Sequence, residues 1–391
     1  MIISSKDFNL ENTMNANKTL IVFAEDWGRF PSSTQSLISA LLKQDWHVTW
    51  INSIGLRKPS LSISYFKRIL EKLAQYVLGK KSKYRLSLPE HLTVIHPLII
   101  PFIGNSIIDT LNCFILKKQL KPALKKMKQP IIWVTLPSAY PFIKIFNNCP
   151  LVYYCCDDYS ALAKHPLSKL DFFEKQLIEK AALILVTSAV LAKKMPKNKT
   201  HYLDHAIDIE LFTKPYARPN DLPTGKPIAG FYGSLCSWVD INLIYQCAIR
   251  LKNWNFVFIG PKNIDLKKLE TLSNFFYLGP KAYADIPAYS QHWDVGLIPF
   301  IYNQQIAACN PLTFKEYLSA GKPVVTTNIP ALHIYKKHIY IAKDTDDFIN
   351  GIVSSLHDNK EEIRKNLVKD QSWDNRALAL EEQLLDLCSF H

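Results

Sequence analysis

The sequence lacks the patterns of several familiar sites. Its eight cysteines include no Cys-x-x-Cys pair and no histidine at a metal-binding spacing, and Cys155 and Cys156 are adjacent within an apolar run. We therefore expect neither a disulfide framework nor a zinc site, and we expect a reducing compartment. No Gly-x-Gly-x-x-Gly follows the first predicted strand, so nothing there supports a dinucleotide site.

Long hydrophobic runs are also missing. Residues 1–17 are polar and mixed, without the apolar core of a signal peptide, and we expect a flexible extension in which Met14 is an alternative start. The stretch 97–116 comes nearest to a membrane span, but Pro101 and Gly104 interrupt it. We therefore expect a cytoplasmic protein that is peripheral at the inner face of the cell membrane.

Acidic residues are outnumbered by basic ones. The chain has 47 Lys and Arg against 34 Asp and Glu, a net charge of +13. Such an excess predicts an anionic partner, which can be nucleic acid, an acidic membrane or a phosphorylated substrate. Two segments hold much of it: 57–85 has nine basic residues and one acid, and 117–128 has six lysines and no acid.

The first basic segment contains a predicted helix at 65–78, with an apolar stripe beside basic residues. This pattern is typical of a helix that lies on a membrane surface. The alternative is a helix that packs on its domain with a solvated basic face. We favour the membrane because further basic residues follow the helix. The residues expected to contact the anionic membrane are Lys67, Arg68, Lys80, Lys81 and Lys83.

Strand-like and helical segments alternate along the chain, as in doubly wound parallel sheets. The fold class expected is α/β, with two Rossmann-like domains facing a cleft. A chain of 391 residues is long enough for two such domains. The expected domains are 18–213, then a proline-containing linker at 214–226, then 227–371, and a last helix at 372–391. The expected strands are 19–24, 47–52, 92–96, 131–136, 151–155, 182–187, 228–233, 255–260, 275–278, 294–300, 323–327 and 339–342.

One predicted helix has clear start and stop signals. Asn310 is a favoured N-cap, Pro311 suits the first helical position, and Gly321 followed by Pro323 ends the helix. The free N–H groups at such a helix start suit a phosphate. This segment is therefore expected to point at an anion.

Glu316 lies on this helix away from its apolar face, in line with Leu312 and Thr313 one turn earlier. One turn is about 5.4 Å, close to the spacing between the diphosphate and the ribose of a nucleotide. A carboxylate there can accept hydrogen bonds from two ribose hydroxyls. By spacing alone, the alternative of a solvated surface glutamate is favoured.

The run Asn-Pro-Leu-Thr-Phe-Lys-Glu-Tyr-Leu-Ser-Ala-Gly-Lys-Pro-Val-Val at 310–325 resembles the nucleotide-binding helix of GT-B glycosyltransferases. It departs from that pattern at Thr313, where the family usually has lysine, and at Ala308, where the wider superfamily often has a second glutamate. Residues 230–240, 205–212 and 372–376 are similar to other family segments. Residues 153–160 resemble the subgroup that makes bacterial exopolysaccharide, lipopolysaccharide and teichuronic acid.

The resemblance implies a hexosyltransferase that moves sugar from a nucleotide-sugar donor to a membrane-associated, lipid-linked glycan acceptor in bacterial surface polysaccharide synthesis. No Asp-x-Asp stands in a metal-binding context, so the enzyme is expected to need no metal. The resemblance also implies no cofactor and no nucleic-acid partner. A sugar-nucleotide 2-epimerase and a catalytically dead, basic membrane-binding protein are the alternatives. The expected donor-binding residues are Gly233, Ser234, Tyr283, Asn310, Pro311, Leu312, Thr313, Lys315 and Glu316.

Other candidates carry open alternatives. Asp157 is the candidate general base, with helix capping or a lysine partner as the alternative; its neighbour Asp158 points the opposite way in an extended segment. Trp27 and Gly28 line the acceptor side or form a turn beside a core tryptophan. Tyr283 contacts the nucleobase or packs in its loop.

Overall fold

The computed structural model describes residues 18–29, 31–54, 88–100, 103–125, 127–162 and 168–389. The predicted helix at 65–78 and the membrane residues Lys67, Arg68, Lys80, Lys81 and Lys83 lie outside these ranges. The extension 1–17 does as well. In the described ranges, no helix is both long and apolar enough to cross a membrane.

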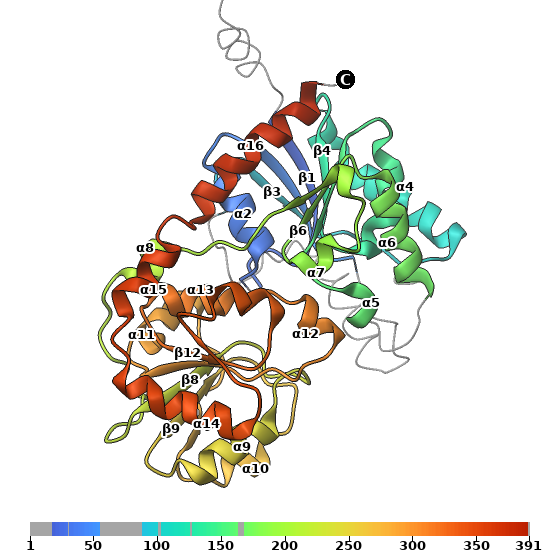
Figure 1. The fold of residues 1–391 in the computed structure, drawn as a ribbon. Helices are drawn as coiled ribbons and strands as arrows, with labels where there is room; N and C mark the ends of the chain where they lie inside the picture. The colour runs from blue at the N-terminus through green and yellow to red at the C-terminus, as the bar shows by residue number, and fades with distance from the viewer. Residues whose placement is uncertain are drawn as a thin grey trace, which may run out of the picture.

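The first domain contains a parallel sheet of seven strands with the order β3-β2-β1-β4-β5-β6-β7 (Figure 1). Six of its strands follow the predicted segments closely, and β7 was not predicted, because it has only three residues and two are exposed. The strands are β1 (Thr19–Phe23), β2 (His47–Ile51), β3 (Leu92–Ile95), β4 (Ile131–Val134), β5 (Leu151–Cys155), β6 (Leu183–Val186) and β7 (Thr200–Tyr202).

Strand β1 shows how both faces of this sheet are buried. Leu20 and Val22 pack in one core, and Ile21 and Phe23 pack in the core on the opposite face. Helix α2 (Ser33–Leu42) covers the first face. The second face is covered by α4 (Ser106–Leu124), the 3-10 helix η1 (Pro137–Phe146) and α6 (Ser168–Lys180). The short helices α5 (Tyr159–Leu162) and α7 (Ala189–Ala192) follow β5 and β6.

The second domain contains a parallel sheet of six strands with the order β10-β9-β8-β11-β12-β13. Both sheets are doubly wound, so the predicted fold class, two parallel-sheet α/β domains, is confirmed. The strands are β8 (Ile228–Tyr232), β9 (Asn255–Ile259), β10 (Phe275–Tyr277), β11 (Val295–Ile298), β12 (Val324–Thr326) and β13 (Tyr340–Ile341). The helices around them are α8 (Ile209–Thr213), α9 (Ile241–Arg250), α10 (Lys267–Glu270), α11 (Ile286–Ser290), α12 (Gln304–Ala308), α13 (Leu312–Ser319), α14 (Thr345–Ser354) and α15 (Glu361–Val368).

The last helix returns to the first domain. Helix α16 (Trp373–Ser389) lies along α2 in Figure 1. Its side chains Trp373, Ala377, Leu380 and Leu384 are buried in the same core as Leu20 and Val22. The core of the first sheet is therefore completed by the end of the chain.

Carboxyl ends of parallel strands are where ligand sites of open α/β sheets form, next to the point at which strand order reverses. That point lies between β1 and β4 in the first sheet and between β8 and β11 in the second. The loops after β5, β6 and β7 contact α12 and the segment around α13. We call this contact region the domain boundary.

Candidate functional site

Helix α13 begins one residue later than predicted. Pro311 is its N-cap, with φ −66° and ψ 118°, and no side chain caps the helix. Proline has no hydrogen-bonding side chain, so the first N–H groups receive no side-chain acceptor from the cap position. The prediction that Asn310 caps this helix is wrong. The predicted end is confirmed: Gly321 has a left-handed φ of 73° directly after the C-cap Ala320.

Asn310 instead connects the two domains. Its side-chain amide donates to the carbonyl of Thr187 at 2.9 Å and to a carboxylate oxygen of Asp204 at 2.8 Å. Both partners lie in the first domain. The segment that leads into α13 is thereby fixed against the carboxyl ends of the first sheet.

Lys315 makes a second link across the domain boundary. Its side chain is 1% exposed, and its ammonium lies 2.5 Å from the carbonyl of His205, 2.7 Å from Gln371 Oε1 and 2.7 Å from Asp204 Oδ2. An ammonium has three donors, so these partners use all of them. Lys315 is therefore a boundary residue, and the prediction that it contacts donor phosphate is not supported by this placement.

Glu316 is buried, and the expectation that it is a solvent-exposed position is wrong. Only 1% of the Glu316 surface is exposed. One carboxylate oxygen accepts the hydroxyl of Tyr232, and the other accepts the hydroxyl of Tyr283 at 2.5 Å. Burial raises the pKa of Glu316 to about 7, although both tyrosine hydroxyls act to lower it.

The tyrosines place Glu316 beside the end of β8. Tyr232 is the last residue of that strand, and its N–H donates to the hydroxyl of Tyr317 at 3.3 Å. Tyr283 is half-buried, and its ring lies 5.8 Å from the ring of Phe212. The structure thus brings Tyr283 to Glu316, a predicted pair of donor residues from different elements.

The predicted turn follows β8 directly. Gly233 has a φ of 145°, and its N–H donates to the carbonyl of Ile259 at 3.0 Å. Gly260 approaches it so closely that a Cβ on Gly260 would lie 2.0 Å from the carbonyl oxygen of Gly233. Glycine is needed at both positions for this conformation and approach. Ser234 follows and is exposed, so the turn presents a small side chain and backbone to solvent.

Tyr317 fixes α13 closely on the second sheet. A Cβ on Gly296 of β11 would lie 2.6 Å from the Tyr317 ring, so only glycine allows the helix this near. The ring of Tyr317 also lies 5.2 Å from that of Tyr232, edge to face. Leu312 contacts the hydrophobic cores of both domains. The start of α13 is therefore held in a defined place at the domain boundary, and Thr313 beside it is half-buried.

Asp157 and Asp158 lie at the end of β5 and have different surroundings. The Asp158 carboxylate is 2.5 Å from Lys194 Nζ, accepts the Ser160 hydroxyl at 2.6 Å and accepts the Gln304 amide at 3.2 Å from across the boundary. Burial acts to raise the pKa of Asp158, but these partners outweigh it and lower the pKa. Helix capping and pairing with a lysine, the two alternatives considered for Asp157, are thus roles of its neighbour Asp158.

The Asp157 carboxylate has no hydrogen-bond or ion-pair partner among the residues that the structure describes. It is open to solvent, yet surrounding protein disfavours its charged form and raises its pKa, and the adjacent Asp158 raises it further. Burial raises the pKa of the Cys309 thiol to about 12, with a contribution from Asp157. Asp157 therefore faces the segment that leads into α13.

Trp27 and Gly28 form a turn after β1. The Trp27 N–H donates to Asn52 Oδ1 at 3.0 Å, and its ring meets that of Trp50 edge to face at 4.8 Å. The Gly28 N–H donates to Gln35 Oε1 at 2.8 Å, and Gly28 has a left-handed φ of 73°. The structure therefore shows the turn beside a core tryptophan; an acceptor role for its exposed side stays a prediction.

Several boundary residues had no signal in the sequence. Gln304 and Asp204 lie outside any motif, and each contacts a partner more than 100 positions away. Lys281 pairs with Asp221 of the linker at 2.6 Å. The described ranges contain no group of three or more His, Cys, Asp or Glu placed to hold a metal ion.

Comparisons with known proteins agree with this architecture. Residues 226–358 match the family described as "Glycosyl transferases group 1". TuaH of Bacillus subtilis strain 168, named as a glycosyltransferase of teichuronic acid biosynthesis, is 26% identical over 284 residues, which cover 65% of this chain and 72% of TuaH.

Solved structures show the same fold at low identity. Sucrose-phosphate synthase of Thermosynechococcus elongatus superposes with a TM-score of 0.69 at 14% identity, over 95% of this chain and 100% of that chain. Anabaena HepE in complex with UDP-glucose superposes with a TM-score of 0.66 at 13% identity, over 94% of this chain and 99% of that chain.

Proposed function

The chain has the GT-B fold and carries a group 1 glycosyltransferase domain at residues 226–358, and from this premise we propose a specific reaction. In this reaction the protein transfers a hexosyl group from a nucleotide-sugar donor to a membrane-associated, lipid-linked glycan acceptor in bacterial surface polysaccharide synthesis. The named role of TuaH in teichuronic acid synthesis and the UDP-glucose bound to HepE support this choice.

The observation that carries the proposal is the start of α13. Its first N–H groups have no side-chain cap, and they lie at the domain boundary, where Asp157 acts electrostatically on Cys309 just before the helix. A helix start of this kind stabilises an anion through its dipole and its free donors. We assign it to the diphosphate of the donor, with the turn at Gly233 and Ser234 as the second contact.

The leaving group in this reaction is a nucleoside diphosphate. Negative charge grows on its phosphate oxygen as the bond to the sugar breaks, and fixed N–H donors stabilise that charge. Leu312 and Thr313 provide backbone N–H donors of this site, and Pro311, which has no N–H, precedes them as the N-cap. We propose that these donors make a metal ion unnecessary.

Glu316 is assigned to the ribose. Both of its oxygens accept tyrosine hydroxyls in this structure, so a ribose hydroxyl must take the place of one of them. Tyr283 is the partner that can leave, because it is half-buried on a short 3-10 turn, whereas Tyr232 is buried at the end of β8. Displaced from Glu316, Tyr283 stays near the nucleobase.

Asp157 is assigned to the acceptor. A general base must be able to accept a proton near neutral pH, and a raised pKa improves this ability. Its carboxylate makes no hydrogen bond to the described residues, so it is available to the attacking hydroxyl. Trp27 and Gly28, at the carboxyl end of β1, are proposed for the acceptor side. This role of Asp157 assumes inversion at the anomeric carbon.

The reaction is tested by incubating the protein with UDP-, GDP- and dTDP-sugars, with and without a bacterial membrane lipid extract. We expect one nucleotide sugar to bind and to release its nucleoside diphosphate only when the extract is present. A modified nucleotide sugar formed without extract would identify an epimerase. Absence of binding to every nucleotide sugar would contradict the proposal and favour a catalytically inactive protein.

The membrane association rests on the basic segment 57–85. Each Lys or Arg near an anionic surface contributes on the order of 1 kcal/mol. Replacing five basic residues by Gln should therefore release the protein from anionic vesicles at physiological salt; unchanged vesicle binding would contradict it. The replaced residues are Lys67, Arg68, Lys80, Lys81 and Lys83. The control replaces exposed lysines of the second domain and of the segment before α16, namely Lys252, Lys336, Lys337, Lys360 and Lys369.

A further inference from the structure

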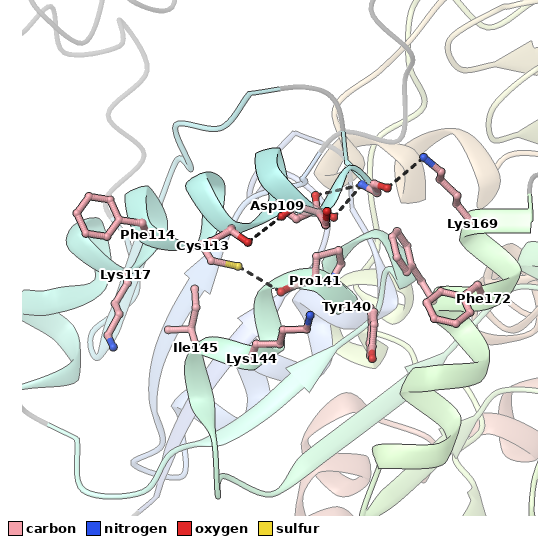
Figure 2. A pocket seen from close by; sticks show the side chains of 14 residues that line it. Asp109, Cys113, Phe114, Lys117, Tyr140, Pro141, Lys144, Ile145, Lys169 and Phe172 are labelled. Atoms are coloured by element: carbon pink, nitrogen blue, oxygen red, sulfur yellow. Dashed lines mark hydrogen bonds between the residues drawn. The ribbon is translucent and has the colours of Figure 1, made fainter.

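A pocket of about 650 Å³ lies on the outer side of the first domain, between α4, η1 and α6 (Figure 2). This volume falls within the range of small-molecule sites. The residues that line it are Gly104, Ser106, Asp109, Thr110, Cys113, Phe114, Lys117, Tyr140, Pro141, Lys144, Ile145, Lys169, Phe172 and Phe173. None of them belongs to the proposed donor site.

Four of the fourteen residues that line this pocket are aromatic. Phe114 and Phe172 are 56% and 52% exposed, which is unusual for large apolar side chains that lie at one pocket. The ring of Tyr140 meets that of Phe172 edge to face at 6.3 Å. Covering these rings with an apolar chain would be favourable, because it removes apolar surface from water.

The same pocket carries more positive than negative charge, and two of its lysines, Lys144 and Lys169, act electrostatically on the Asp109 carboxylate. Lys117 and Lys144 make no hydrogen bond or ion pair with any residue in the described ranges, and Lys169 donates only to the carbonyl of Gly104, at 3.1 Å. Among the residues that the structure describes, Asp109 is the one carboxylate lining the pocket, and both of its oxygens accept the N–H of Gly104 at 3.0 Å. An anion would therefore find three ammonium groups there.

The apolar surface continues along α4. A second hollow of about 430 Å³ shares Phe114 and Lys117 with the first. Lys118 lies over the Phe114 ring, with its ammonium 4.4 Å from the centroid. The other residues lining this hollow are Lys121, Leu124 and Lys125. The helix thus presents an apolar groove with a rim of lysines.

One end of the pocket lies at the carboxyl edge of the first sheet, the edge that also carries Asp157. Helices that connect parallel strands run back along the sheet, so α4 and α6 begin at the carboxyl edge of the strands. Gly104 and Lys169 lie at these helix starts. Asp157 follows β5 at the same edge. A molecule in the pocket would have one end at this edge and the other along α4.

We propose that the pocket between α4, η1 and α6 binds one anionic amphiphile. A phosphate-type head lies at Lys144 and Lys169, and a hydrocarbon chain lies on Phe172 and Phe114 and continues into the groove on α4. Identifying this amphiphile as the carrier of the glycan acceptor rests on the proposed function; the binding itself does not.

The test uses dodecyl phosphate below its micelle concentration, titrated into the full chain by calorimetry. We expect one molecule of dodecyl phosphate to bind per protein molecule. It should bind at least ten-fold tighter than inorganic phosphate, which lacks the hydrocarbon chain, and at least ten-fold tighter than dodecyl maltoside, which lacks the charge. Lys144→Gln with Lys169→Gln should weaken binding roughly 30-fold, from about 1 kcal/mol per lysine. Phe172→Ser should weaken it as well, because it removes exposed apolar surface from the pocket wall.

The matched control is Lys336→Gln with Lys337→Gln, two exposed lysines of the second domain, which should bind dodecyl phosphate like the wild type. Equal affinity of the Lys144 and Lys169 double variant and this control would overturn the proposal. So would inorganic phosphate binding as tightly as dodecyl phosphate, or many amphiphiles bound per chain, which would indicate adsorption on a surface.

Nucleotide-sugar titration on the same proteins separates this proposal from the proposed function. The pocket variants should bind nucleotide sugar like the wild type, because the pocket shares no residue with α13. A wild-type protein that binds dodecyl phosphate but no nucleotide sugar would contradict the proposed function and leave the pocket assignment supported. The reverse result would contradict the pocket assignment alone.

Discussion

Donor binding should depend on pH through Glu316. The pKa of its carboxyl is about 7 in the folded protein, and only the ionised form is acceptor-only on both oxygens, one for Tyr232 and one for a ribose hydroxyl. With that pKa, about nine-tenths of the carboxyls are ionised at pH 8 and about one-tenth at pH 6. The affinity for a nucleotide sugar should therefore fall roughly ten-fold from pH 8 to pH 6.

Glu316→Gln removes this titration and keeps the size of the side chain. A hydrogen bond to a charged group contributes roughly 1.5 to 3 kcal/mol, so the variant should bind donor about 10- to 100-fold more weakly at pH 8. Its affinity should be the same at pH 6 and pH 8. The difference between wild type and variant should consequently shrink as the pH falls.

The assay is isothermal titration of the nucleotide sugar that binds best, at pH 6, 7 and 8. A nucleotide sugar is preferable to a free nucleoside diphosphate because a terminal phosphate itself titrates near pH 6. Equal wild-type affinity at pH 6 and pH 8 would refute the reasoning. An unchanged pH dependence in Glu316→Gln would place the titrating group elsewhere.

The same carboxyl affects stability in the opposite direction. Its folded pKa lies above the ordinary value of 4.5, so the folded state holds the proton more tightly than the unfolded state. This contribution is fully present below pH 4.5 and is lost as the pH rises through about 7, a change on the order of 3 kcal/mol. Melting curves of the unliganded protein should show this slope, and Glu316→Gln should lack it.

Further variants test the neighbouring assignments. Asp157→Asn should lower turnover by roughly 10² to 10⁴ without changing donor affinity; wild-type turnover in this variant would move the base elsewhere. Asp158→Asn should leave more activity and lower the melting temperature, since it removes the ion pair of a buried carboxylate with Lys194. Tyr283→Phe removes a hydroxyl that lowers the pKa of Glu316, so the pH midpoint of donor binding should shift upward in calorimetry; an unmoved midpoint would contradict the contact. Leu318→Ala should cost roughly 2 to 5 kcal/mol of unfolding free energy in denaturant titrations, because Leu318 is 0% exposed; a smaller loss would mean that the helix repacks.

Much of the fold could be predicted because buried parallel strands are short apolar runs. The segment 151–155 was predicted with the bounds that β5 has, and its period of two correctly separated the surroundings of Asp157 and Asp158. Strand β7 escaped prediction because Thr-His-Tyr carries no apolar run. Helix α12 escaped because its five residues are too few to show a period.

The surroundings of α13 could not be predicted from its own pattern. A 3.6-residue period assumes that one face meets water, but residues 314–319 are all buried. Glu316 is covered by Tyr232 and Tyr283, and Lys315 by Asp204. These partners lie 33 to 111 positions away in the sequence, so no local residue spacing predicts them.

The return of α16 to the first domain bears on how the chain is made. Domains usually fold as units during synthesis, the amino-terminal one first. Here Trp373, Ala377, Leu380 and Leu384 fill part of the core around Leu20. Until those residues leave the ribosome, α2 and one face of the first sheet keep apolar surface exposed. The domain that is synthesised first is thus the last to be completed, and a nascent chain that stalls after residue 371 would carry a fully synthesised second domain beside an unfinished first one.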